Sequence, residues 1–405
     1  MIPTRAALTL PALLLALTGC GAVSAITLRT TTNSLGGPDV APHVVGLNGT
    51  APPAAPAPSP TAPAVVASPP HVTHIVATVP IAAGKEWLEI LAASGAVVAR
   101  TEISPPEPWL TRAGAGGAYW TQGGAEHELA LSGAVRSLGP VPSDANGVVI
   151  APDGASYAYA TSDVAADGAA VNKIVVVHPS ETPEVVADRV SNPNHPTSDA
   201  PQSWDYYLIS WTAPGITFAR VPTGGCGCGS FDMQMQSAFS ATINPATKTV
   251  TTLTADTACP LSNVGSGLEA VCFASNNTTG GTDAIRIMTG GVKHSYPMSG
   301  ANVAGNAVFS PTARTVAYET IPISQDSCGA PLTPTLHVLT VANGAAISAN
   351  VGDFTPAAWA PDGSIYGQLA RNDGSDNWVV AVNPATFAMT RLTADVPGVA
   401  LVGIM

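Results

Sequence analysis

A corner that recurs along the chain constrains its fold more than any other feature of the sequence. In each copy an apolar strand runs into a proline turn, and an alternating strand, usually with a tyrosine, follows. The copies are "VVIAPDGASYAYAT" (148–161), "AVFSPTARTVAYET" (307–320) and "AAWAPDGSIYGQLA" (357–370), with "LISWTAPGITFAR" (208–220) as a looser match. Their turn positions, 152, 213, 311 and 361, lie 61, 98 and 50 residues apart, so a further corner is expected near 262. Periods of about 40 to 50 residues with four short strands each are typical of a β-propeller.

The repeats divide the chain into sheets of four strands, called blades. The predicted blades are 105–143, 144–192, 201–256, 257–300, 301–353 and 354–395, and the segment 71–104 holds only three strands. The last stretch, "GVALVGIM" (398–405), is a strand without a blade. We expect it to become the inner strand of the first blade, which closes the ring and leaves no unpaired edge. The prediction is therefore an all-β propeller of seven four-stranded blades. Six or eight blades are the alternatives if 105–143 and 257–300 are misassigned.

Composition agrees with many short strands and tight turns. Charged residues make up 10% of the chain, with Gly 39 and Pro 37. Beyond residue 25 no stretch shows the sustained apolar spacing of a helix. The net charge of −12 repels phosphate backbones, and no basic run offsets it, so nucleic acid is not an expected partner.

The corners resemble the TolB-type, WD-repeat-like propeller repeats, whose signature is a W-S-P-D-G corner followed by an A-Y strand. The final blade, "WAPDGSIYG…NWVVAVNPATFAMTRLTAD", is the nearest match. The resemblance implies a propeller over residues 71–405 and no particular function, because periplasmic scaffolds, peptidase accessory domains and enzymes share this fold. Asp362 of this corner could be a catalytic carboxylate. The equivalent positions of the other corners hold Asp153, Thr312 and Pro214. Because a turn needs only a bend and accepts different residue types, we interpret Asp362 as a turn residue.

The N-terminus has the pattern of an export signal. Arg5 precedes an apolar run from Ala6 to Leu17, which is too short to span a bilayer. The ending Leu-Thr-Gly-Cys resembles the lipobox of bacterial lipoproteins, which implies cleavage after residue 19 and acylation of Cys20. Two or three acyl chains give stable anchoring. An ordinary secretory signal that happens to contain Cys20 is the alternative.

The segment between the signal and the repeats is predicted to be a disordered stalk. Residues 51–70, "APPAAPAPSPTAPAVVASPP", hold eight prolines in twenty positions. Such a segment favours polyproline II and reaches ~60 Å at ~3.1 Å per residue. A proline-rich recognition motif is the alternative. The predicted organisation is signal peptide 1–19, lipidated Cys20 with the stalk to residue 70, and propeller 71–405.

The lengths of the connections between strands predict which end of the ring carries the function. Counting strands outward in a blade, the first-to-second and third-to-fourth connections lie at one end, which we call the turn face. The remaining connections lie at the opposite end, the loop face. The long segments are 161–172, 190–204, 220–236 and 320–334, and all belong to the loop face. Since long loops commonly carry function, we expect the loop face to be the binding face.

The cysteines are predicted to brace this face. Export favours disulfides, and the candidates are Cys226, Cys228, Cys259 and Cys328, with Cys226 or Cys228 paired to Cys259 as the preferred bridge. Cys272 lies inside a strand and is expected to be a buried free thiol. The Cys226-x-Cys228 spacing is tight for zinc, and no histidine lies close by, so neither a metal nor a cofactor is predicted.

One aromatic cluster is a candidate ligand site. The stretch "SWDYYLISW" (203–211) presents Trp204, Tyr206 and Tyr207 next to a long loop. These rings could stack on a sugar or anchor a partner. The competing interpretation is a strand whose alternate aromatics pack between blades. No nucleophile elbow, metalloprotease motif, P-loop or dinucleotide fingerprint occurs, so no catalytic residue is assigned.

The sequence favours a lipid-anchored binding or scaffold protein on the extracytoplasmic side of the cell membrane. Its expected partners are the bilayer, through acylated Cys20, and a protein or cell-envelope glycan, through the loop face. Two alternatives remain open. One is an extracytoplasmic hydrolase or lyase with its site at the central channel, whose catalytic groups would leave no linear motif. The other is a carbohydrate-binding propeller.

Overall fold

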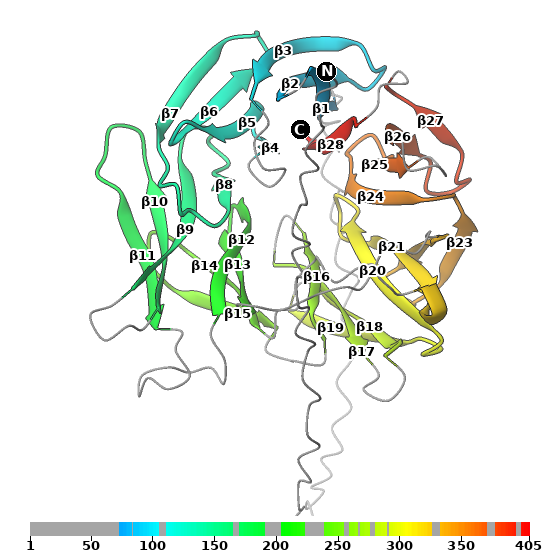
Figure 1. The fold of residues 1–405 in the computed structure, drawn as a ribbon. Coiled ribbons are helices and arrows are strands. Elements are labelled where there is room, and N and C mark those ends of the chain that lie inside the picture. Colours follow the sequence, from blue (N-terminus) through cyan, green and yellow to red (C-terminus); the bar gives the residue numbers. More distant parts are fainter. Residues whose placement is uncertain are drawn as a thin grey trace, which may run out of the picture. The chain divides into compact units, whose positions relative to one another are not determined.

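The protein is an all-β propeller. The computed structural model describes residues 73–82, 84–104, 111–164, 170–190, 204–222, 239–254, 259–265, 268–275, 280–289, 291–325, 333–370, 377–393 and 398–405. Seven four-stranded antiparallel sheets are arranged in a ring (Figure 1). The seven-blade prediction is confirmed, and every strand lies inside the blade expected from the repeats. Within the described part of the chain, no helix is long and apolar enough to cross a membrane.

The strands of the first four blades have the following bounds. Blade 1 comprises β1 (His74–Ala82), β2 (Lys85–Ala92), β3 (Val97–Ile103) and the C-terminal β28 (Ala400–Ile404). Blade 2 comprises β4 (Thr111–Gly114), β5 (Gly117–Gln122), β6 (Ala125–Ala130) and β7 (Val135–Pro140). Blade 3 comprises β8 (Val148–Ile150), β9 (Tyr157–Val164), β10 (Ala170–Val177) and β11 (Glu184–Val190). Blade 4 comprises β12 (Trp204–Thr212), β13 (Gly215–Pro222), β14 (Phe239–Ile243) and β15 (Val250–Thr254).

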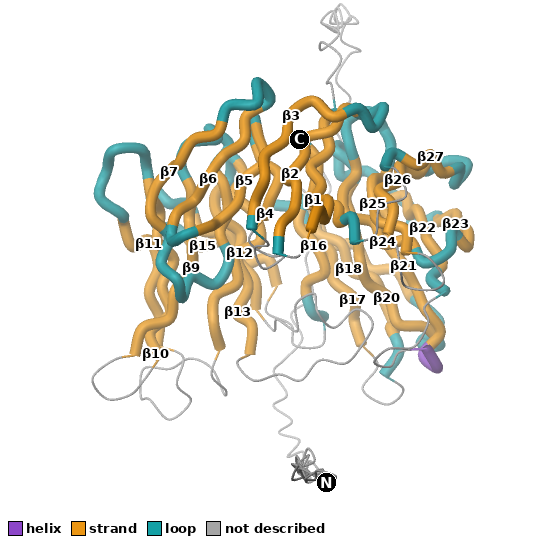
Figure 2. The backbone as a smooth tube through the Cα atoms, turned by 45° about the horizontal axis from the view of Figure 1, so that its top comes forward, coloured by secondary structure: helices purple, strands orange, loops and turns teal. Residues whose placement is uncertain are grey.

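The remaining three blades follow the same order. Blade 5 comprises β16 (Leu261–Val264), β17 (Ala270–Ser275), β18 (Thr282–Thr289) and β19 (Val292–Pro297). Blade 6 comprises β20 (Asn302–Phe309), β21 (Thr315–Pro322), β22 (Thr335–Thr340) and β23 (Ala346–Asn350), with one turn of 3-10 helix, η2 (Ile323–Gln325), after β21. Blade 7 comprises β24 (Phe354–Trp359), β25 (Ile365–Ala370), β26 (Asn377–Val382) and β27 (Met389–Arg391). Figure 2 shows the strands of all seven sheets running between the two ends of the ring.

The C-terminal strand closes the ring, as predicted. The strand order in blade 1 is β28-β1-β2-β3, and Ile75 pairs with Ile404 in antiparallel register. Because β28 ends where β1 begins, the first described residue, Thr73, and the last residue, Met405, both lie at the turn face. The chain that precedes Thr73 therefore joins the propeller at that face.

Burial follows the position of a strand within its blade. In β21, a second strand, residues 316–321 are all buried, because a neighbouring blade covers each face of the sheet. In β27, a fourth strand, all three residues are exposed at the perimeter. Apolar side chains fill the spaces between blades, as Val308, Phe354 and Ile365 do between blades 6 and 7. The second strand is thus buried on both faces, whereas the outer strand is exposed to solvent.

Candidate functional site at the mouth of the channel

The corners that revealed the repeat form hydrogen-bonded turns. The Asp153 carboxylate accepts hydrogen bonds from the main-chain N–H groups of Ala155 and Ser156, both at 2.8 Å, and from the Ser156 hydroxyl at 2.8 Å. Partial burial disfavours the charged carboxylate, but these hydrogen bonds outweigh it and lower the pKa of Asp153. The Ser156 hydroxyl also lies 2.9 Å from Nδ1 of His178. Ser156 is 1% exposed, and its hydroxyl is hydrogen-bonded to both Asp153 and His178. This Asp-Ser-His group therefore stabilises the turn and does not present a nucleophile.

The corner of the last blade has the same role. Oδ1 of Asp362 accepts the main-chain N–H of Ser364 at 2.8 Å, and Oδ2 accepts the hydroxyl of Tyr366 at 2.7 Å. Burial, helped by the hydrogen bond to Asp362, raises the pKa of Tyr366 far above its ordinary value. Both carboxylate oxygens are therefore engaged within the turn, as expected for a turn residue.

A cavity of about 350 Å³ lies at the turn-face mouth of the central channel. Its wall is made by the ends of four inner strands, β16, β20, β24 and β28, which border the centre of the ring on one side in Figure 1. The lining is mainly apolar: Val264, Val308, Phe309, Trp359 and Ile404 contribute. This position is a usual one for a propeller site, because inner strands of several blades meet there.

The polar side chains at this mouth are held by the protein itself. The indole N–H of Trp359 donates to the carbonyl of Gly363 at 3.1 Å. The amide of Asn263 donates to the carbonyl of Ala307 in the neighbouring blade. The hydroxyl of Ser310 accepts the main-chain N–H of Thr315 at 3.1 Å. The mouth thus presents a fixed apolar surface that fits binding of an apolar group better than acid–base chemistry.

A buried carboxyl group lies on the second strand of blade 6. Glu319 is 1% exposed, and Nδ2 of Asn306 donates to its Oε2 at 2.8 Å. Among the described residues, its Oε1 has no hydrogen-bond partner. Burial raises the pKa of Glu319 to about 8, with a further contribution from the negative charge of Asp353. A carboxyl group that titrates near neutrality is a candidate acid or base, but this one is enclosed between strands. Sequence reasoning missed this residue, because a single Glu in an otherwise mostly apolar strand was the only signal.

The structure corrects the aromatic ligand site. Trp204 and Tyr206 are each 3% exposed, and their rings pack edge to face with centroids 4.9 Å apart. They belong to the apolar cluster between blades 3 and 4, whereas Tyr207, on the opposite face of β12, is 39% exposed. Because side chains alternate along a strand, these three residues cannot form one platform. The packing interpretation of this stretch is therefore correct for Trp204 and Tyr206.

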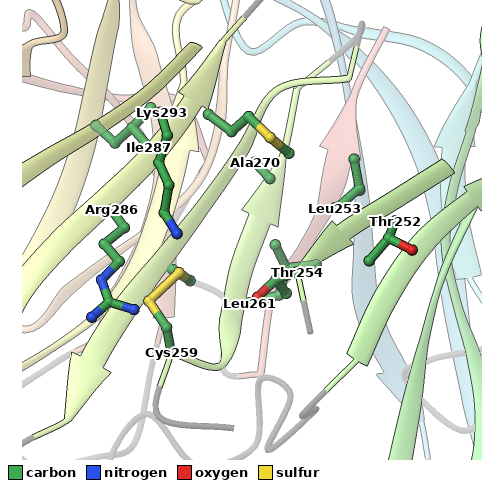
Figure 3. Close-up of a pocket in the computed structure, with 11 residues that line it drawn as sticks. Thr252, Leu253, Thr254, Cys259, Leu261, Ala270, Arg286, Ile287 and Lys293 are labelled. Carbon is green, nitrogen blue, oxygen red and sulfur yellow. A yellow bond between two sulfur atoms is a disulfide. The ribbon is translucent and has the colours of Figure 1, made fainter. Parts of the chain in front are cut away.

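The structure also corrects the cysteine scheme. Cys259 forms a disulfide with Cys272, across a Cα–Cα distance of 5.3 Å, so Cys272 is not a free thiol and Cys259 is not bonded to Cys226 or Cys228. The reason lies in the register of β16 and β17. Leu261, the first residue of β16, pairs with Cys272 of β17. Cys259 precedes Leu261 by two residues, and its sulfur is bonded to that of Cys272 (Figure 3). Cys20, Cys226, Cys228 and Cys328 lie outside the described residues. Among the residues that are described, no three His, Cys, Asp or Glu side chains gather to bind a metal.

Comparison with known proteins adds the fold and nothing finer. No family model matches the sequence. No curated protein matches it either. Several solved structures do match it, as similar folds. Acylaminoacyl peptidase from Pyrococcus horikoshii is 8% identical with a TM-score of 0.50, over 80% of this chain and 50% of that one.

Two further structures are similar at lower scores. Oligogalacturonate lyase from Vibrio parahaemolyticus is 8% identical with a TM-score of 0.48, over 75% of this chain and 85% of that one. TolB from Acinetobacter baumannii is 9% identical with a TM-score of 0.39, over 80% of this chain and 81% of that one. The likeness is one of fold. A shared fold does not imply a shared function, so function must be argued from the residues.

Proposed function

We propose that the protein is a lipid-anchored, extracytoplasmic β-propeller that binds a protein or a cell-envelope component through its loop face. The observation that carries the proposal is the path of the chain into the ring. β28 ends and β1 begins at the turn face, where the main chains of His74 and Met405 are hydrogen-bonded. An anchor at Cys20 would therefore be attached to the turn face. The loop face would remain free for a partner.

The contrast between the two faces supports this assignment. Side chains in the short turns bond their own backbone: Oδ1 of Asn244 accepts the N–H groups of Ala246 and Thr247, and Oδ1 of Asn383 accepts those of Ala385 and Thr386. These turns are satisfied internally and offer few groups to a partner. The long connections of the sequence all belong to the loop face, where binding residues are commonly found.

Binding is favoured over the two alternatives on specific grounds. The channel mouth is lined mainly by apolar groups, and the polar side chains discussed above are bonded to the protein's own main chain. The carbohydrate alternative rested on three aromatics, of which Trp204 and Tyr206 are buried. The enzyme alternative would use the channel, and Glu319, the described carboxyl with a pKa of about 8, is enclosed between strands.

The anchor and the face require separate tests. Metabolic labelling with a palmitate analogue should mark the wild-type protein and not the Cys20→Ala variant, which should also leave the membrane fraction. Equal membrane retention of the two proteins would contradict the anchor.

The binding face can be tested by photo-cross-linking in intact cells. A photoreactive amino acid is placed in the full-length protein at Ser275 or Ile323, exposed at the loop face, or at Asn343 or Thr386, exposed at the turn face. We expect a discrete adduct from the loop-face positions and none from the turn-face positions. Adducts confined to the turn-face positions would overturn the assignment of the face.

A further inference from the structure

The large apolar side chains that are exposed to solvent gather at one end of the ring. Thirteen of them occur in the described part of the chain, and ten of these lie at the turn face. Seven of the ten, one from each blade, take the first or second position of the outermost strand, directly after the turn that precedes it. We call these seven residues the rim: Val97, Val135, Val185, Val250, Val292, Ile347 and Met389. The other three lie in or beside turns of the same face, at Val98, Leu131 and Leu268.

Strand propensity does not account for the position of the rim. Val and Ile favour strands anywhere along their length. Among the side chains whose burial the structure describes, the opposite ends of the same seven strands carry no exposed large apolar group. Each rim residue is 42% to 56% exposed, so about half of its surface is free to contact something else.

The turns beside the rim carry little charge. In the seven connections between third and outermost strands, Glu181 and Lys248 are the only Asp, Glu, Lys or Arg residues. The ammonium of Lys248 is paired with the carboxylate of Glu184 at 2.9 Å. The apolar channel mouth opens at the centre of the same face. The turn face therefore presents apolar groups at its edge and at its centre, with few charges that would have to lose water on contact.

The spacing of the rim fits a flat, fluid apolar layer better than a folded partner. A protein interface concentrates its apolar anchors in a packed central patch. The rim residues instead lie on seven separate blades, and their strands follow the perimeter of the ring in Figure 1. Separate side chains at one level can enter the boundary between lipid headgroups and acyl chains, where binding strength scales with the apolar area buried.

The entry point of the chain indicates which layer lies against this face. Thr73 and Met405 lie at the turn face, where the main chains of His74 and Met405 are hydrogen-bonded. An anchor at Cys20 would therefore tether the propeller to the bilayer from this side. A tether raises the effective concentration of the propeller at the surface, so even a weakly apolar face is sufficient for docking.

We propose that the turn face docks on the lipid surface, with the rim at the level of the headgroups and the loop face directed away from the membrane. The inference rests on the lipid anchor of the proposed function. It adds the orientation of the propeller, because a tether alone would leave the ring free to tumble.

The test uses the whole acylated protein on vesicles of phosphatidylcholine, which have no net charge to repel a protein of net charge −12. A photoreactive amino acid is placed at Val292 or Ile347 of the rim, or at Ile81 or Ile323, which are exposed at the loop face. After irradiation, mass spectrometry measures the phospholipid adducts. We expect at least about tenfold more adduct at the rim positions, because burial of several half-exposed apolar side chains favours the docked orientation by at least that factor.

Charged substitutions test the rim itself. With the photoreactive group at Ile347, Val135→Asp combined with Val250→Asp should lower the adduct yield about tenfold, because docking would remove water from two carboxylates. The matched control, Ile81→Asp combined with Ile323→Asp, adds the same charges at the loop face and should leave the yield unchanged. All four residues are exposed, so both proteins should fold, which cooperative thermal unfolding checks. If the rim variant does not fold, the comparison of positions decides.

The outcomes separate this inference from the anchor. Protein that floats with the vesicles but gives equal adduct yields at both faces would overturn the inference and leave the anchor intact. An unchanged yield in the folded rim variant would do the same. Protein that does not float with the vesicles would overturn the anchor and the inference together. Adducts between two copies of the protein at the rim, in place of phospholipid adducts, would assign the rim to a dimer and overturn the proposal.

Discussion

The main chain of Met405 exchanges two hydrogen bonds with that of His74: the N–H of Met405 donates to the His74 carbonyl at 2.9 Å, and the N–H of His74 donates to the Met405 carbonyl at 3.3 Å. The final residue of the chain is thus bonded to the first residue of β1. Next to them β28 and β1 pair at four further positions, with a shift in register between Val76 and Ala77. Closure of the ring is therefore noncovalent and depends on a single short strand.

Deletion of residues 400–405 should destabilise the propeller strongly. It removes the ladder to β1 and exposes Ile75 and Ala77, both fully buried. Since each hydrogen bond contributes about 1 kcal/mol net, we expect a loss on the order of 4 kcal/mol or more in the free energy of unfolding. Urea denaturation of the truncated and full-length proteins measures it. Met405→Ala keeps the main-chain bonds and should cost little; similar stability of the truncated protein would refute the role of β28.

Glu319→Gln should stabilise the protein increasingly as the pH rises. The folded-state pKa of Glu319 is about 8, above its ordinary value of 4.5, so the fold favours the protonated form. The contribution of Glu319 to wild-type stability is therefore full below about pH 4.5, falls as the pH rises from there, and is lost once the pH has passed through 8. The variant does not titrate there, and its advantage should grow to on the order of 4 kcal/mol near pH 9.

The measurement is the urea midpoint of both proteins from pH 5 to about pH 9, the range over which the charge develops. The exposed Glu102→Gln serves as the control and should leave the pH profile unchanged. A constant difference between Glu319→Gln and wild type at all pH values would mean that the carboxyl is charged throughout.

Replacing both Cys259 and Cys272 with Ser should lower the free energy of unfolding by about 3 kcal/mol, the usual effect of opening a loop of this length. The two residues are 13 positions apart in the sequence. Urea midpoints without reductant measure the loss, and mass mapping of non-reduced peptides tests the pairing directly. A peptide joining Cys259 to Cys226 or Cys228 would contradict the bridge described here.

Trp204→Ala and Tyr207→Ala should differ sharply although the residues are three positions apart. Trp204 is buried between blades, with the guanidinium of Arg220 4.5 Å from its ring centroid, so its truncation should cost about 3–5 kcal/mol. Tyr207 is 39% exposed, and its truncation should cost less than about 1 kcal/mol. Thermal unfolding compares them, and equal losses would show that Tyr207 is packed as tightly as Trp204.

The repeat could be recognised in the sequence because the corners contain characteristic turn residues. Proline and Asp-Gly turns mark the junction of first and second strands whatever packs around them, so their spacing counted the blades and left the last strand to close the ring. The course of a loop that connects two strands has no such sequence signature. Nothing in the sequence indicates that the segment before Leu261 returns to β17, and the partner of Cys259 was therefore missed.

Features that depend on which blade covers which face were also hidden. Alternation along β12 predicts two faces, but burial of Trp204 and Tyr206 depends on blade 3 lying against one of them. The apolar channel mouth likewise consists of strand ends contributed by separate blades.

The bonding of β1 on both sides has a mechanical consequence. Tension transmitted through the chain before Thr73 would act along β1, which is held by β28 on one edge and β2 on the other. A pull along a strand loads its ladder hydrogen bonds together in shear, whereas a pull across it would break them one at a time. A propeller attached at this point would resist drag on its tether through the whole first blade.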